Sequence, residues 1–479
     1  MALAAITETK TKKRDYMARF VTADFTSNIE PCILRYTTKF DEKIDFQEQY
    51  IDAKVISHTY EDGVGVIVFD KPITRIDSYP FYEEVNLKSI TLPNCITEIG
   101  DGAFCGCYNL KSISLGTGIK YIGAKSFQHC SGLESITIPD STIEIGEEVF
   151  QHCDNLKAFY GKFASEDNRC LIVDGVLVSF APKGVASYSI PEGVTSIGIG
   201  AFLSCEKLTS VTIGYDVTTI DEKAFAWCEK LSSVIIPHGV TEIAMWAFRD
   251  CDALTELSMP DSITEIGEAA FWNCKNLTEI SLGDGVKLID DKAFARCYKL
   301  NSITIPNSTT EIGSYAFNDC TALTSVTLSN RITKIQEATF AGCSSLKEVN
   351  IPNSVTEIEK LAFIRCERLT NLVIGDNITT IGDKAFKCCS GLTKVTIGSG
   401  VTSIGSGAFC DCGNIELILC KAIVPPQLAE DAFRGIPENT IIVIPQDYED
   451  FYALSGWMKY TDKKESPKKQ SSSCDNSPF

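Results

Sequence analysis

A 23-residue unit repeats along most of the chain, and this repeat constrains the fold more than any other feature. The segment Leu208–Cys228 returns as Leu231–Cys251 with the same apolar residues at the same positions. A fixed period of this kind predicts a solenoid, in which each repeat forms one coil and contacts only its neighbours. The length of 479 residues, which by itself suggests about three domains, is therefore compatible with one elongated body.

One phenylalanine marks each repeat, and the intervals between these residues count the coils. The interval is 23 residues, except across one interruption and at the last step, where it is 24. The markers are Phe81, Phe104, Phe127, Phe150, Phe202, Phe225, Phe248, Phe271, Phe294, Phe317, Phe340, Phe363, Phe386, Phe409 and Phe433. The sequence therefore predicts a mainly β repeat solenoid of about 15 turns.

Each repeat is expected to contain one short strand, a second side with inward-pointing apolar residues, and a return. Val211 and Ile213 alternate with polar residues, which is the period of a strand with one buried face. Because the coils stack, these strands should pair with their neighbours in a long parallel sheet. Pro or Gly then ends the strand, since proline lacks the N–H that a β-ladder needs. Val217 and Ile220 point inward on the next side, and Ala224–Cys228 is expected to form a short helical or irregular return, since the three-residue spacing of Phe225 and Cys228 matches one helical turn.

Glycine often lies four positions before the marker phenylalanine, as Gly267 and Gly313 do. Other repeats place Glu359, Gln336 or Ala244 at the same position. Because these residues avoid positive φ, we expect no left-handed backbone there.

Cysteine follows the repeat as well. Of the 21 cysteines, 13 lie three residues after a marker phenylalanine. They are Cys107, Cys130, Cys153, Cys205, Cys228, Cys251, Cys274, Cys297, Cys320, Cys343, Cys366, Cys389 and Cys412. Residues at one repeat position stack in a column, and a free cysteine behaves as a small buried hydrophobe. We therefore expect a packed column of thiols; stacked disulfides and metal binding are alternatives, although Cys-x-x-Cys pairs with zinc spacing are absent.

Segments without the repeat interrupt and close the stack. Two β-rich runs flank Asp62-Gly63 and two others flank Asp174-Gly175, which predicts two hairpins. A solenoid also needs caps that cover its terminal apolar faces, and we expect a strand at 441–444 and an amphipathic helix from Tyr448 to Trp457. The predicted organisation is an N-terminal β-rich cap (1–65), repeats (66–156), an inserted β-hairpin (157–185), repeats (186–433), a C-terminal cap (434–460) and a disordered tail (461–479).

The formal charge of −19 excludes several classes of partner. Nucleic-acid phosphates require clustered lysine and arginine, so no nucleic-acid partner is expected. No apolar run is long enough to span a membrane, and Ala2–Ile6 is too short for the core of a signal peptide. As written, the sequence predicts a monomer that stays inside the cell unless another route exports it.

The repeat resembles the BspA-like class of leucine-rich repeats, and the copies Leu254–Cys274 and Leu300–Cys320 are close to the class pattern. The resemblance covers about Val66 to Phe433. Tyr160–Arg169 and the end of the chain also look like elements of bacterial members, including those of gut Bacteroidetes. The resemblance implies a right-handed leucine-rich-repeat solenoid and a cell-surface or secreted protein that binds host or microbial proteins, often as an adhesin. The family pattern carries no catalytic residues.

The sequence offers little for catalysis. It contains no HExxH, no Gly-x-Ser-x-Gly and no phosphate-binding loop. Acidic pairs such as Glu147-Glu148 and Asp290-Asp291 should face outward beside the return, whereas catalysis by paired carboxylates needs a cleft. His129 and His152 share one repeat position and are expected to lie side by side, by coincidence or as a weak metal site. We predict that the chain is not an enzyme and needs no cofactor.

Two outward surfaces are candidates for binding. Thr209, Ser210 and Thr212 and their equivalents predict a flat, hydroxyl-rich sheet face, although threonine also suits any exposed strand. Tryptophan falls on three consecutive returns, and exposed Trp, Tyr and Arg are typical of interface hot spots; the alternative is that the indoles shield the stacked backbone. The predicted binding residues are Trp227, Met245, Trp246, Arg249, Trp272 and Tyr298.

The predicted function follows from these surfaces. We expect a non-enzymatic leucine-rich repeat protein that presents an extended surface for protein or glycan binding, in adhesion or host interaction. The alternative is an intracellular, or phage- or mobile-element-encoded, interaction scaffold of the same fold.

Overall fold

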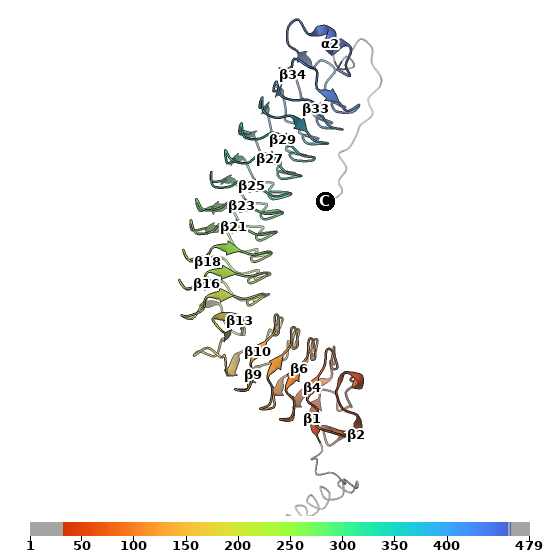
Figure 1. Cartoon of the computed structure of the whole chain (residues 1–479), viewed down its shortest axis with the longest axis vertical. Helices are drawn as coiled ribbons and strands as arrows, with labels where there is room; N and C mark the ends of the chain where they lie inside the picture. Colours follow the sequence, from red (N-terminus) through yellow and green to blue (C-terminus); the bar gives the residue numbers. More distant parts are fainter. Residues whose placement is uncertain (1–31, 458–459, 461–479) are drawn as a thin grey trace, which may run out of the picture.

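The chain folds into a curved stack of coils (Figure 1). The computed structural model describes residues 32–457 and residue 460. It contains about 16 turns with a period of about 23 residues, one turn more than the phenylalanine markers predict. The additional turn comes from the interruption, because Phe180 stacks on Phe202 with 4.7 Å between the ring centroids. The expected disordered tail, 461–479, lies outside the described residues.

One side of each coil carries a strand whose central side chain faces the core. Residues pair with their equivalents one repeat away, as Val211 of β16 pairs with Val234 of β18, so the register is the repeat itself. These strands are β5 (Leu87–Thr91), β7 (Ser112–Ser114), β9 (Ser135–Ile138), β11 (Ala158–Gly161), β14 (Ser187–Ser189), β16 (Ser210–Thr212), β18 (Ser233–Ile235), β20 (Glu256–Ser258), β22 (Glu279–Ser281), β24 (Ser302–Thr304), β26 (Ser325–Thr327), β28 (Glu348–Val349), β30 (Asn371–Ile374), β32 (Lys394–Ile397), β34 (Leu417–Cys420) and β36 (Ile441–Val443).

A second, shorter strand follows in each coil and buries one isoleucine or leucine in most of them. Ile220 of β17 pairs in parallel with Ile243 of β19, again one repeat away. The short strands are β4 (Arg75–Ile76), β6 (Glu98–Ile99), β8 (Tyr121–Ile122), β10 (Glu144–Ile145), β15 (Ser196–Ile197), β17 (Thr219–Ile220), β19 (Glu242–Ile243), β21 (Glu265–Ile266), β23 (Leu288–Ile289), β25 (Glu311–Ile312), β27 (Lys334–Ile335), β29 (Glu357–Ile358), β31 (Thr380–Ile381), β33 (Ser403–Ile404) and β35 (Gln427–Leu428).

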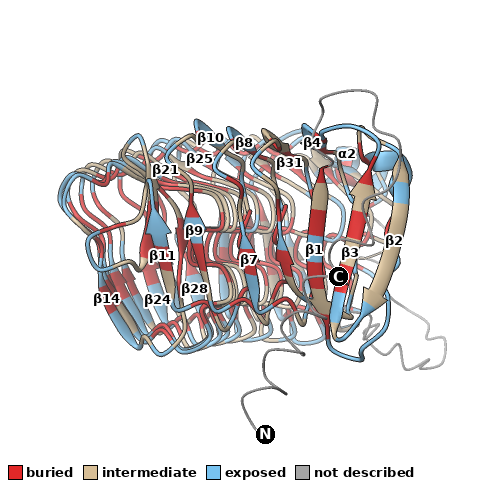
Figure 2. Cartoon of the chain, turned by 90° about the horizontal axis from the view of Figure 1, so that it is seen from below, coloured by how far each residue is buried: buried red, intermediate tan, exposed pale blue. Residues whose placement is uncertain are grey.

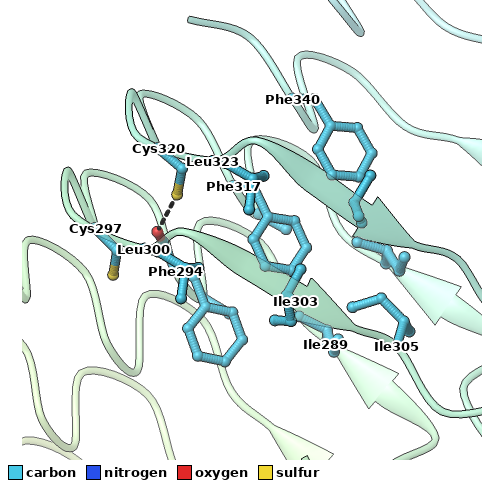
Figure 3. Close-up of a cluster of buried hydrophobic side chains, with 14 of the residues drawn as sticks. Ile289, Phe294, Cys297, Leu300, Ile303, Ile305, Phe317, Cys320, Leu323 and Phe340 are labelled. Carbon is cyan, nitrogen blue, oxygen red and sulfur yellow. Dashed lines mark hydrogen bonds between the residues drawn. The ribbon is translucent and has the colours of Figure 1, made fainter. Parts of the chain in front are cut away.

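The core runs along the inside of the stack, and the end-on view shows buried residues lining the coils (Figure 2). The marker phenylalanines form a column in which neighbouring rings lie nearly parallel; the centroids of Phe294 and Phe317 are 5.5 Å apart (Figure 3). The predicted cysteine column is also present and buried. Almost all of its thiols donate to a carbonyl oxygen of the preceding coil, as Cys320 does to Phe294 at 3.2 Å, so these sulfurs have a polar partner inside the core.

The returns are turns, not the short helices that the sequence spacing suggested. The N–H of Cys228 donates to the carbonyl of Phe225, which closes a four-residue turn. The N–H groups of Phe225 and Trp227 instead donate along the stack, to the carbonyls of Ala247 and Arg249, both at 2.8 Å. Because alternate N–H groups bond to the next coil, they are not available for a helical ladder.

The inserted segment contributes β11 and a hairpin of β12 (Cys170–Val173) and β13 (Val176–Phe180). The hairpin lies along the stack, because β13 pairs in parallel with β15. Leu171 packs into the core before the insertion, whereas Leu177 and Phe180 pack into the core after it. The short-strand sheet is interrupted between β10 and β12, and the stack changes direction at this point (Figure 1).

Both ends of the described stack are covered. β1 (Ile33–Thr38), the 3-10 helix η1 (Glu48–Tyr50), β2 (Val55–Glu61) and β3 (Val64–Phe69) form the N-terminal cap, and β1 pairs antiparallel with β5. At the other end, α2 (Glu449–Ala453) is shorter than the helix predicted from Tyr448 to Trp457. The chain turns back after α2, so that the buried indole of Trp457 donates to the carbonyl of Pro426 at 3.0 Å.

Candidate binding surface

Left-handed backbone recurs in the returns, two residues before and two residues after the marker phenylalanine. In one coil these residues are Lys223 and Trp227, both with φ of 57°; in the next they are Trp246 at 59° and Asp250 at 58°. As predicted, the glycine position four residues before the marker, such as Gly267, is not left-handed. Most of these positions carry ordinary side chains, and glycine occupies only some of them, such as Gly200 and Gly342, so no regular glycine pattern in the sequence indicated them. Because this strain is shared by almost all coils, it belongs to the fold and does not by itself mark a site.

Three tryptophans from successive coils surround one arginine. The guanidinium carbon of Arg249 lies 5.3 Å from the ring centroid of Trp227, 5.1 Å from that of Trp246 and 4.3 Å from that of Trp272. All four side chains are half-buried. We call these residues the tryptophan–arginine cluster. Each such cation–π contact contributes about 0.5–2 kcal/mol, more where the cation is desolvated, so the cluster is pre-ordered while part of its surface still faces solvent.

Arg249 is fixed by a carboxylate as well as by the indoles. Its Nε donates to Asp250 at 3.1 Å, and its side chain is 25% exposed. The other carboxylate oxygen of Asp250 accepts a hydrogen bond from the amide of Asn273 in the next coil. The guanidinium is therefore held in one place, and it retains N–H groups beyond the one that Asp250 binds.

Lys223 and Arg296 extend the cluster at its two ends, with their cationic groups 5.3 and 5.1 Å from the nearest indole centroid. Burial lowers the pKa of Lys223, but ion pairs with Glu222 at 2.7 Å and Glu148 at 3.5 Å raise it overall, so the ammonium stays charged. The surface is thus an aromatic and cationic row on a chain whose formal charge is −19.

Two of the six predicted residues are not brought into this cluster by any contact among the described residues. Met245 is half-buried, and its carbonyl accepts the N–H of Lys223 at 3.1 Å. Tyr298 follows the cysteine column and is 36% exposed; its carbonyl accepts the N–H of Ala322 at 3.1 Å. Met245 and Tyr298 lie close to cluster residues in the sequence, but they occupy different positions within the repeat from the three indoles.

Part of the hydroxyl-rich face holds neighbouring coils together. Thr209, Thr278 and Thr324 each donate a side-chain hydrogen bond to a carbonyl of the preceding coil, at 2.8, 2.9 and 3.0 Å. A hydroxyl that is already bonded to the backbone has less capacity for a ligand. This observation favours the structural role of these threonines over a binding role.

The histidines and acidic pairs are also explained by local packing. His129 and His152 stack with 4.4 Å between ring centroids and 3° between planes, so their nitrogens lie in parallel planes and do not converge. Asp291 accepts the N–H of Ser314 at 2.6 Å in the next coil. No group of three or more metal-ligating side chains gathers anywhere in the part of the chain that the structure describes.

These features define the class of protein. Coils with buried Leu, Ile and Phe and in-register parallel strands form a leucine-rich repeat solenoid. A family model of the BspA type leucine-rich repeat region, which holds six copies, matches residues 60–165, 178–301 and 287–416. These matches span most of the chain, and the chain belongs to this family.

Solved structures of bacterial leucine-rich repeat proteins are similar to this chain to different degrees. A leucine-rich repeat protein from Bacteroides ovatus is 27% identical, with a TM-score of 0.54 over 82% of this chain and 90% of that one. A leucine-rich cell surface protein from Faecalibacterium prausnitzii is 27% identical, with a TM-score of 0.40 over 75% of this chain and 94% of that one. A search of the curated proteins found no match. Among the described residues, no helix is long and apolar enough to cross a membrane.

Proposed function

We propose that this chain is a non-enzymatic binding protein whose tryptophan–arginine cluster holds a protein or glycan ligand, in adhesion or host interaction. The observation that carries the proposal is the convergence of three half-buried indoles on one fixed guanidinium. Tryptophan and arginine contribute more binding energy than other residues at interfaces. Indole faces also stack on the apolar faces of sugar rings, and the guanidinium donates to carboxylates or hydroxyls.

The fold itself does not require these tryptophans. At the position of Trp227, later coils carry Arg296, Asp319 and Arg365, all with the same left-handed backbone, and these coils contain no tryptophan. If indoles were needed to shield the stacked backbone, these coils would need them too. The clustering therefore supports a role outside the coil, and repeat proteins offer such roles through their extended surfaces.

The test replaces Trp227, Trp246 and Trp272 by serine together and measures binding of the full chain to immobilised host matrix glycoproteins, with and without enzymatic removal of their glycans. We expect the affinity to fall at least about tenfold, which is the scale of hot-spot residues. Undiminished affinity of the triple variant would refute the proposal. Loss of binding after glycan removal would identify a glycan ligand, and persistence would identify a protein ligand.

A matched control replaces three exposed side chains away from the cluster, Tyr215, Ile235 and Val373, which are 87%, 65% and 60% exposed. This control variant should bind as the unmodified chain does. Thermal unfolding of both variants must remain close to that of the unmodified chain, so that a lost interaction is not confused with a damaged coil.

A further inference from the structure

Two thiols outside the cysteine column face each other at the N-terminal end of the stack. The Sγ atoms of Cys32 and Cys95 are 3.0 Å apart, although the residues are 63 positions apart in sequence. Cys32 directly precedes β1 of the cap, and Cys95 lies in the turn after β5 of the first coils. Because β1 and β5 pair antiparallel, with Arg35 opposite Thr91, the start of one strand lies beside the end of the other. The thiol pair therefore joins the cap to the coils that it covers.

This pair differs from the column thiols in access and in bonding. The column thiols are buried, and almost all of them donate to a phenylalanine carbonyl, as Cys107 does to Phe81 at 3.1 Å. Cys95 is the one free cysteine among the described residues that is not buried. Cys32 is 5% exposed, and burial raises its pKa to about 12, with Cys95 adding to the rise. A partly exposed thiol with a buried partner is the arrangement of an attacking and a resolving cysteine.

We propose that Cys32 and Cys95 form a thiol–disulfide exchange site that seals the cap onto the stack, with small-molecule disulfides of the glutathione class as the co-reactant. The Cys95 thiolate attacks one sulfur of the small disulfide and expels one thiolate, which gives a mixed disulfide. Cys32 then loses its proton and attacks the Cys95 sulfur, which expels the second small thiolate. Two protein thiols and one small disulfide become one protein disulfide and two small thiols.

The expected consequence is local stabilisation of the cap. A solenoid opens most readily from its ends, where a coil has one neighbour instead of two. A disulfide restricts the unfolded chain, and the restriction grows with the length of the closed loop. The Cys32–Cys95 link encloses η1 and the strands β1 to β5, so oxidation should suppress opening of this end and leave the distant C-terminal coils unaffected.

The test treats the full-length protein with reduced and oxidised glutathione at defined ratios, followed by peptide mapping by mass spectrometry and limited proteolysis. We expect a Cys32–Cys95 disulfide while column thiols such as Cys107 stay reduced. Cleavage within the cap should become at least about tenfold slower, since proteolysis follows the population of the open state. A persistent glutathione adduct on Cys95, or a fully reduced pair under oxidising ratios, would overturn the proposal.

A variant series separates this effect from general oxidation. Cys95→Ser should lose both the disulfide and the protection of the cap, whereas Cys105→Ser, which alters a buried thiol in the following coil, should retain both. Because mapping of the unmodified protein reports the link directly, the proposal remains testable even where a variant folds poorly. Equal cap protection in oxidised Cys95→Ser would also overturn it.

Discussion

The phenylalanine column makes a specific prediction about how stability is distributed. Phe294 is fully buried, and its ring stacks between Phe271 and Phe317, with centroid distances of 5.4 and 5.5 Å. Replacing a buried phenylalanine by alanine removes its burial and leaves a cavity, which costs about 3–5 kcal/mol. Phe294→Ala should therefore lower the free energy of unfolding by about this amount. Tyr215 is 87% exposed, so Tyr215→Ala should change the free energy of unfolding by less than about 0.5 kcal/mol.

The stacking itself can be isolated with a double-mutant cycle. Phe294 and Phe317 should couple by about 0.5–1.5 kcal/mol, the range of aromatic pairs. Phe294 and Phe363, which are separated by two intervening rings of the column, should show a coupling near zero. This contrast follows from a stack in which each coil contacts only its neighbours.

The assay is urea unfolding followed by far-UV circular dichroism, with hydrogen exchange measured by mass spectrometry to locate the loss of protection. Exchange should accelerate first in the coils next to Phe294. If Phe294→Ala cost less than about 1 kcal/mol, or if the distant pair coupled as strongly as the adjacent pair, the nearest-neighbour description of this solenoid would be wrong.

Two further predictions concern charge. Burial, followed by neighbouring His129, lowers the pKa of His152 from its ordinary value of 6.5; the unfolded chain then binds the proton more readily, so stability is complete above pH 6.5 and falls as the pH drops below it. Asparagine suits the left-handed backbone at this position, and His152→Asn should reduce the change of the urea midpoint between pH 7 and pH 5. An unchanged dependence of the midpoint on pH would contradict this reasoning. Burial raises the pKa of Glu148, but its hydrogen bond and ion pair with Lys125 at 3.2 Å and its ion pair with Lys223 at 3.5 Å lower it overall. Glu148→Gln should cost roughly 1–3 kcal/mol above pH 4.5 and progressively less below it, measured by urea unfolding, and an equal cost at all pH values would argue against the ion pairs.

The fold was predictable because one short pattern of apolar residues is repeated many times along the chain. Val211, Ile213, Phe225 and Cys228 each have equivalents one repeat away, so errors at single positions cannot alter the period. The sequence could not decide between a helical and an irregular return, because buried side chains three residues apart occur both in helices and in four-residue turns. Only the bond from Trp227 to the next coil distinguishes them, and such a bond depends on stacking.

The inserted hairpin could also be predicted only in part. Its hairpin around Asp174-Gly175 is a local feature that turn residues indicate. Whether the hairpin projects from the stack or lies along it depends on the pairing of Val176 with Ser196. That pairing joins the insertion to the coil that follows, and no local propensity specifies it.

The sequence indicated the residues of the candidate site but not their arrangement, for a related reason. Trp227 lies two residues after its marker phenylalanine, Trp246 two residues before, and Trp272 one residue after. Three different repeat positions predict no common column, yet the left-handed turns bring them around Arg249. Residues inside the coil repeat and determine shape, whereas these outward positions differ between coils. Because the interiors of the coils are so similar, a ligand site in such a solenoid must be distinguished by outward side chains that change from coil to coil. Here the tryptophans make three consecutive returns differ from the others.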